Sequence, residues 1–432
     1  MNWPLLVFLL SFVMVFVVRI PIALGMMMSA IFYFDLAGGP GADISMVAAQ
    51  FLNQMNSKFV LIAVPLFVFM AEVMNTGKIT DMIFEFAGAV VGKKKGALGH
   101  VNVVASIIFS GMTGSALADA SGLGMMEIKA MNDSGYDKGF SSAITAASAT
   151  IGPIFPPSIP MIFYAMLSGA SIGALFIGGM LPGILVGIAL MIYIAMVAHK
   201  RDYPLGGAVT FRQMLAITLK ASPALFSVVV LLGGIYTGIV TPTEAGALAA
   251  FYAIFVAVFI YKAMGLRDFL KVVRNTVRTT GTLSLLVGSA YAFSYIVAIE
   301  HIPDLVANWL LHITSNKYLL LLLINVVFII LGMFIDTMAI TLVFIPIVLP
   351  LVTSLGINLV HFGVLITLNM MIGLSTPPFG MLLFVVSGIS GTPLKDVIRE
   401  ILPMLLVLFI VLFLVTYIQP IVLFLPGLLG LL

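Results

Sequence analysis

The chain has 432 residues, of which 62% are hydrophobic and 9% are charged, and its net charge at neutral pH is +3. This composition excludes a soluble domain, and the long apolar stretches predict a polytopic, all-helical membrane protein. Because the chain contains no cysteine, disulfide bonds, thiolate metal sites and cysteine nucleophiles are excluded as well.

The apolar segments predict two halves, residues 1–210 and 211–432, with the same order of elements. In the first half we expect spans near 4–18, 20–36, 59–75, 139–168 and 180–198. In the second half we expect them near 222–240, 243–261, 280–300, 360–390 and 402–420. Each half adds one re-entrant helical hairpin, at 98–126 and 319–350. The less apolar segments 79–91 and 302–313 predict amphipathic arms that lie flat.

The two halves are also related residue by residue. Motif residues recur 221 positions later in the pairs Pro21 and Pro242, Gly111 and Gly332, Pro156 and Pro377, and Leu181 and Leu402. A constant spacing at four separate places indicates an internal duplication.

Loop charges indicate that the second copy is inverted. Residues 258–279 contain five basic residues, whereas the matching loop 37–58 contains one. Residues 90–97 contain three lysines, and their counterpart 311–318 contains one. The basic member alternates between the halves, and basic loops stay on the cytoplasmic side. We therefore predict an inverted repeat, with the first hairpin entering from the cytoplasm and the second from outside.

A double proline interrupts one apolar segment in each half, at Pro156-Pro157 and at Pro377-Pro378. Proline removes a helix hydrogen bond and clashes with the preceding turn, so 139–168 and 360–390 are predicted to be broken helices. Within a bilayer the freed carbonyl groups are tolerated only in protein or beside a polar cavity. Paired breaks of this kind indicate the midplane ion and substrate site of a transporter.

Polar residues in the hairpins are candidates for that site. The first hairpin contains small and hydroxyl residues around Ser115, which either pack helices together or line a site at the hairpin tip. Asp119 either caps the next helix or lines the site. Asp336 of the second hairpin falls opposite Ser115 at the 221-residue spacing. Its carboxylate suits sodium or a proton, or it is a hydrogen-bonded residue of the tip.

The stretches GMTGSALADASGLG, GIYTGIVTPTEAGALAA and LSTPPFGMLLFVVSGISG resemble the large membrane subunit of tripartite ATP-independent periplasmic (TRAP) transporters. The resemblance extends over essentially the whole chain. It implies a multi-pass protein of the bacterial inner membrane that works with a small four-helix membrane subunit and a periplasmic substrate-binding protein. It also implies sodium-driven uptake of an organic acid, with a sialic acid favoured over a C4-dicarboxylate.

The same resemblance implies an elevator motion, as in the ion transporter superfamily, in which hairpins and broken helices move against a scaffold of the remaining helices. The sodium-binding candidates are then Ser110, Gly111, Ser115, Gly152, Pro153, Gly332, Asp336, Thr337, Ser375 and Thr376. The substrate-binding candidates are Pro157, Ser158, Pro378 and Asp119. Sodium is expected as a coupling ion, with no cofactor, no other metal, no catalytic residue and no nucleic acid.

Two other interpretations remain open from the residues alone. An intramembrane aspartyl enzyme would use Asp119 and Asp336, and would need their carboxyl groups close enough to share a proton. A channel-like subunit, or another secondary anion transporter, would work without a binding protein.

Overall fold

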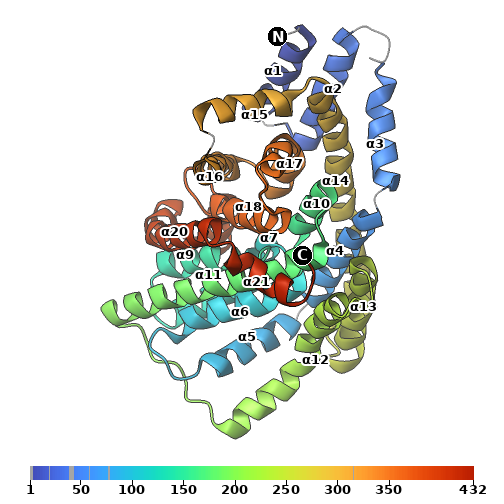
Figure 1. The fold of residues 1–432 in the computed structure, drawn as a ribbon. Coiled ribbons are helices and arrows are strands. Elements are labelled where there is room, and N and C mark those ends of the chain that lie inside the picture. The colour runs from blue at the N-terminus through green and yellow to red at the C-terminus, as the bar shows by residue number, and fades with distance from the viewer. Residues whose placement is uncertain (1–2, 19, 38–42, 58, 76–77, 315) are drawn as a thin grey trace.

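The computed structural model describes residues 3–18, 20–37, 43–57, 59–75, 78–314 and 316–432. Within these ranges the regular elements are all helices, which confirms the all-helical prediction (Figure 1). Seven of the described helices are long and apolar enough to cross a membrane. They are α11 (Ile172–Lys200), α12 (Phe211–Tyr236), α13 (Pro242–Phe255, continued by the π-helical turn η2 to Ile260), α14 (Leu266–Ile299), α16 (Lys317–Phe334), α17 (Thr337–Ser354) and α20 (Leu394–Tyr417).

The remaining helices are shorter. Before α11 they are α1 (Trp3–Val18), α2 (Ile22–Ala37), α3 (Ser45–Ser57), α4 (Ala63–Met74, preceded by the 3₁₀ turn η1, Phe59–Ile62), α5 (Lys78–Val91), α6 (Ala97–Thr113), α7 (Ala116–Ser121), α8 (Leu123–Asp133), α9 (Lys138–Ala149) and α10 (Ile159–Ser168). Later in the chain they are α15 (Ile302–Ile313), α18 (Leu359–Leu374), α19 (Met381–Ser390) and α21 (Pro420–Leu428).

Several spans begin earlier than the apolar pattern predicted. The predicted starts at 180, 222, 280 and 402 were wrong, because α11, α12, α14 and α20 begin at 172, 211, 266 and 394. The helix α3 also lies within 37–58, which we had assigned to a loop. Polar caps explain part of the difference, since Ser171 caps α11 and Thr210 forms a capping box with Gln213 at the start of α12. Charged helical turns can thus extend beyond the apolar part of a span.

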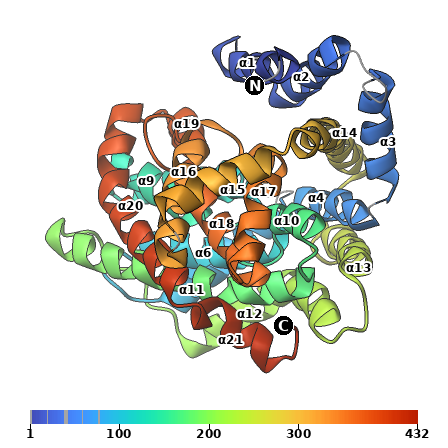
Figure 2. The same cartoon turned by 45° about the horizontal axis from the view of Figure 1, so that its top comes forward.

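The helices form a central group with an outer layer beside it (Figures 1 and 2). In the central group α9 packs on α6 and α20, and α18 packs on α16 and α11. In the outer layer α14 packs on α2, α3 and α4, and α13 packs on α4 and α12. The predicted amphipathic arms are helices that touch both parts, since α5 packs on α6 and α12, and α15 packs on α17 and α14.

Both double prolines lie in non-helical backbone within the central group. Residues 150–158 separate α9 from α10, and residues 375–380 separate α18 from α19. The two hairpins also turn at non-helical tips, at 114–115 between α6 and α7 and at 335–336 between α16 and α17. The fold therefore brings four non-helical backbone segments into its central group, where a polar site can form.

Candidate functional site

The tip of the first hairpin contacts the first helix break. Gly114 ends α6 with a positive φ of 61°, and Ser115 caps α7 by accepting a hydrogen bond at Oγ from the backbone nitrogen of Ala118 at 3.4 Å. A Cβ atom at Gly114 would lie 2.5 Å from the carbonyl oxygen of Pro157. Only glycine allows both this backbone conformation and this close approach.

The tip of the second hairpin contacts the second helix break in a similar way. Asp336 caps α17, because its Oδ1 accepts a hydrogen bond from the backbone nitrogen of Met338 at 2.9 Å. A Cβ atom at Gly373 would lie 2.8 Å from Cα of Gly332, so α16 and α18 touch through their backbones. The backbone nitrogen of Gly380 also donates to the carbonyl oxygen of Met333 at 3.2 Å.

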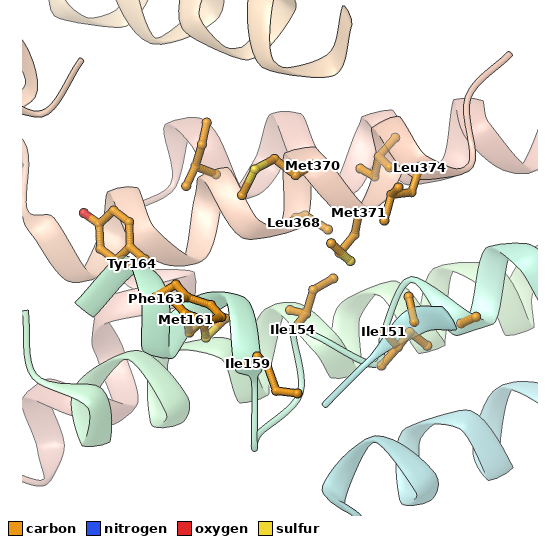
Figure 3. Packing of buried hydrophobic residues seen from close by; sticks show 14 of the residues in the cluster. Ile151, Ile154, Ile159, Met161, Phe163, Tyr164, Leu368, Met370, Met371 and Leu374 are labelled. Atoms are coloured by element: carbon orange, nitrogen blue, oxygen red, sulfur yellow. The ribbon is translucent and has the colours of Figure 1, made fainter. Parts of the chain in front are cut away.

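A cavity of about 50 Å³ lies where the two tips meet, and it contains candidates from both halves. Ser115 and Pro153 line it from the first half, and Asp336 and Thr337 line it from the second. Thr337 Oγ1 is buried and has no hydrogen-bond partner among the described residues. Figure 3 shows the buried side chains of α18, Met371 among them, packed over the adjacent non-helical segment. The cavity therefore combines a carboxylate and hydroxyl groups with apolar walls.

The other sodium-binding candidates of the first half lie close behind this tip. The hydroxyl group of Ser110 donates to the carbonyl oxygen of Ser106 at 2.5 Å. Gly111 faces α12, where a Cβ atom would lie 2.9 Å from a methyl group of Val228, so this glycine serves helix packing. Gly152 lies against the hairpin tip, with its ideal Cβ position 3.3 Å from the backbone nitrogen of Ala116.

In the second half the two hydroxyl candidates already have partners. Ser375 Oγ donates to the carbonyl oxygen of Ala146 on α9 at 3.4 Å, which joins the two broken helices. Thr376 Oγ1 donates to the carbonyl oxygen of Ile372 at 2.6 Å. The oxygen atoms of both hydroxyl groups still have lone pairs that can accept a hydrogen bond or bind a cation.

A second, larger cavity of about 280 Å³ lies between the hairpin tips and the outer layer. Thr113, Ser115 and Asp336 line it from the central group. The outer layer contributes polar side chains of α4 and α14, namely Glu72, Asn75 and Thr279. Glu72 also joins α4 to α14, because its Oε2 accepts a hydrogen bond from the amide nitrogen of Asn275 at 3.2 Å.

The four predicted substrate residues line neither cavity. Pro157 faces Gly114 through its carbonyl group, and Ser158 caps α10 by accepting a hydrogen bond from Met161 at 3.3 Å. Pro378 is exposed, and Asp119 is only 1% exposed within the first hairpin. Asn75 and Thr279 of the outer layer were not predicted, although a polar residue at the end of an apolar span, such as Asn75, was the available signal.

The larger cavity is lined by the carboxyl groups of Glu72 and Asp336, so an anion bound there needs accompanying cations. The residues that line the larger cavity include no lysine, arginine or histidine. Helices α10 and α17 begin at the cavities, through Pro160 and Thr337, and a helix N-terminus attracts negative charge. An anion bound here would thus meet hydroxyl groups and helix N-termini.

Comparison with known proteins shows a shared fold and identifies the family. The YdaH transporter of Alcanivorax borkumensis has the same fold, with a TM-score of 0.60 and 16% identity over 87% of both chains. The family model of the tripartite ATP-independent periplasmic transporter, DctM component, matches residues 8–421. The chain therefore belongs to this family and is the large permease type of subunit, not an enzyme. It is a multi-pass protein of the inner membrane.

Two relatives illustrate the range of named substrates. The chain is 42% identical over 384 residues to the sialic acid TRAP transporter large permease protein SiaM of Vibrio cholerae. The matched residues make up 89% of each chain. It is 37% identical over 380 residues to the C4-dicarboxylate TRAP transporter large permease protein DctM of Pseudomonas aeruginosa, which covers 88% of this chain and 89% of the relative. Large permeases of this family normally work with a small membrane subunit and a periplasmic binding protein.

Proposed function

We propose that this chain is the large membrane subunit of a sodium-driven TRAP transporter that imports an organic acid delivered by a periplasmic binding protein. A small membrane subunit completes the membrane complex. The observation that carries the proposal is the pair of cavities at the hairpin tips, where Ser115 and Asp336 line both. Residues 221 positions apart thereby contribute to one site.

Sodium is assigned to the hairpin tips because their chemistry suits a hard cation. Carboxylate, hydroxyl and backbone carbonyl oxygens are the ligands that such ions prefer. The buried, unpartnered Oγ1 of Thr337 supports this assignment, because an oxygen without a partner is costly unless a ligand occupies the site. In this proposal Asp336 neutralises the ion, and Ser115, Pro153 and Thr337 complete its surroundings.

The substrate is assigned to the larger cavity, in place of the four residues that line neither cavity. Its carboxylate would lie near the N-terminus of α17 and the sodium ions, because the lining contains no basic side chain. The hydroxyl and amide groups of Thr279 and Asn75 would contact the rest of the molecule. A sialic acid is favoured as the substrate, since the relative named for it is the more similar of the two.

The position of this cavity supports the proposal of an elevator motion. It lies between the central group, which carries both hairpins and both breaks, and the outer layer formed by α4 and α14. Movement of the central group against that layer would carry the ions and the substrate together. The arms α5 and α15 touch both parts and would bend or slide during the motion.

The test is uptake by the reconstituted complex, with a panel of labelled organic acids and with or without a sodium gradient. We expect uptake to require sodium, the small subunit and the binding protein. For Asp336→Ala, the sodium concentration for half-maximal uptake should rise about 10- to 150-fold, because a charge-assisted contact contributes about 1.5–3 kcal/mol. Binding of the substrate to the soluble partner should not change.

The matched control is Asp133→Ala, which removes an exposed carboxylate at the end of α8. This variant should keep the sodium dependence of the parent. Uptake that proceeds without sodium or without the binding protein would refute the proposed mechanism. An unchanged sodium activation curve in Asp336→Ala would refute the assignment of this residue while leaving the transporter proposal intact.

A further inference from the structure

Two carboxyl groups are buried in the first hairpin, behind the tip and outside both cavities. Asp119 on α7 and Glu127 on α8 are each 1% exposed. Both oxygens of Asp119 and the Oε1 atom of Glu127 have no hydrogen-bond partner among the described residues. A buried carboxylate is costly unless it is paired, hydrogen-bonded or protonated, so these oxygens call for a donor, a cation or a proton.

A polar network on three helices positions Glu127. The amide nitrogen of Asn102 on α6 donates to Glu127 Oε2 at 2.8 Å and to Thr145 Oγ1 on α9 at 2.7 Å. Ser148 Oγ in turn donates to the Oδ1 atom of Asn102 at 2.6 Å. The network therefore uses both hydrogens of the Asn102 amide group and leaves Glu127 Oε1 without a donor among the described residues.

Asp119 lies on the same face of α6 as this network. Ser106 follows Asn102 by four residues, one helical turn further along, and its hydroxyl group is the neighbour of the Asp119 carboxyl group. Asp119 and Glu127 are also close enough for their carboxyl groups to interact through space. The two unsatisfied carboxyl groups thus face one buried region between α6, α7, α8 and α9.

No basic side chain of these helices supplies the missing charge. On α8 and α9 the basic residues are Lys129 and Lys138, which are both exposed. On α6 the one residue that could carry a positive charge is His100, two positions before Asn102 and therefore on a different face. Helices α7 and α19, which also pack here, contain no basic residue. Among the described side chains of these five helices, the two carboxyl groups therefore have no basic partner.

We propose that Asp119 and Glu127 form a buried cation site, which takes one monovalent cation, either sodium or a proton. The site is distinct from the ion candidates at the hairpin tips, because neither carboxyl group lines either cavity. For sodium, the carboxylate oxygens and the Ser106 hydroxyl group provide hard oxygen ligands. For a proton, two carboxyl groups close together share it, because both cannot be ionised.

The test uses the purified full chain in lipid nanodiscs and does not depend on transport. Equilibrium binding of radioactive sodium and infrared spectroscopy of carboxylic acid groups are measured for Glu127→Gln and Asp119→Asn. The control is Glu85→Gln, which removes an exposed carboxylate of α5. A sodium site predicts one sodium ion fewer in both variants and not in the control. A proton site predicts unchanged sodium binding and an infrared band of a protonated carboxyl group that is lost in Glu127→Gln.

Absence of both signals would overturn the proposal, since the pair would then be neither protonated nor bound to sodium. Ser106→Ala keeps both carboxyl groups and is the second variant if the others fail to fold. It should weaken binding of one sodium ion several-fold for a sodium site, or shift the infrared band for a proton site. If Ser106→Ala changes neither sodium binding nor the infrared band, that result would also contradict the assignment.

Discussion

The backbone contact between Gly332 and Gly373 leads to a quantitative prediction for Gly373→Ala. The new Cβ atom would lie 2.8 Å from Cα of Gly332, 3.0 Å from its carbonyl carbon and 3.1 Å from the carbonyl oxygen of Ile329. All three neighbours are backbone atoms, so no side chain can move aside. Because carbon atoms pack at about 3.5–4.0 Å, α16 and α18 must separate by roughly 0.7 Å.

A separation of this size removes roughly a quarter to a half of the attraction in the neighbouring contacts. Overpacking of a well-packed core typically costs about 1–3 kcal/mol, and we expect Gly373→Ala to lower the free energy of unfolding by that amount. The measurement is denaturant unfolding of the purified chain in detergent. Sodium activation of uptake should also weaken, because this contact joins the second hairpin to the second break.

The matched control is Gly388→Ala on α19, where the added Cβ atom meets nothing within 4 Å. Replacing an exposed glycine inside a helix by alanine stabilises by about 0.5–1 kcal/mol, so the control should be slightly more stable than the parent. Equal stability of the two variants would refute the reasoning, because it would mean that α16 and α18 separate without cost.

Two further predictions concern the chain outside the membrane-spanning part of its helices. Lys95 donates a hydrogen bond to the exposed carboxylate of Asp202 and lowers the pKa of that group. The pair therefore stabilises the fold fully at a pH above the ordinary aspartate pKa of about 3.9. This stabilisation is lost as the pH falls through the lowered pKa. Asp202→Asn should reduce the loss of stability measured in acid, and an unchanged acid profile would contradict the pairing. At the start of α13, Thr241 Oγ1 accepts from Glu244 N at 3.3 Å, and Glu244 Oε2 accepts from Thr241 N at 2.8 Å. Thr241→Ala should cost about 0.5–2 kcal/mol of unfolding free energy, whereas Thr241→Ser should keep most of it.

Much of the fold could be predicted because its causes are local. The lack of charge in long segments predicts helices in a bilayer, and the double prolines lie in non-helical backbone at 150–158 and 375–380. The helix ends were predicted less well, because caps such as Thr210 and charged turns extend a helix beyond its apolar part. The inverted repeat and the elevator motion remain predictions from loop charge and from resemblance.

Not all of the residues that line the candidate site could be predicted from local sequence patterns. Asp119 follows Ser115 by only four residues, yet α7 presents Leu117 and Ala118 to the larger cavity and turns Asp119 toward α6. Successive residues of a helix point in directions about 100° apart, so the tertiary packing of α7 decides which of them meets a ligand.

The sequence by itself determined the membrane class, the helix breaks and the family, since these depend on composition, proline and long motifs. Only the tertiary structure decided that Ser115 and Asp336 line common cavities, and that α4 and α14 complete the larger one. It also decided that Asp119 and Glu127 are both buried beside α6. Such contacts join residues far apart in the chain or on different helix faces, and they depend on how whole helices pack.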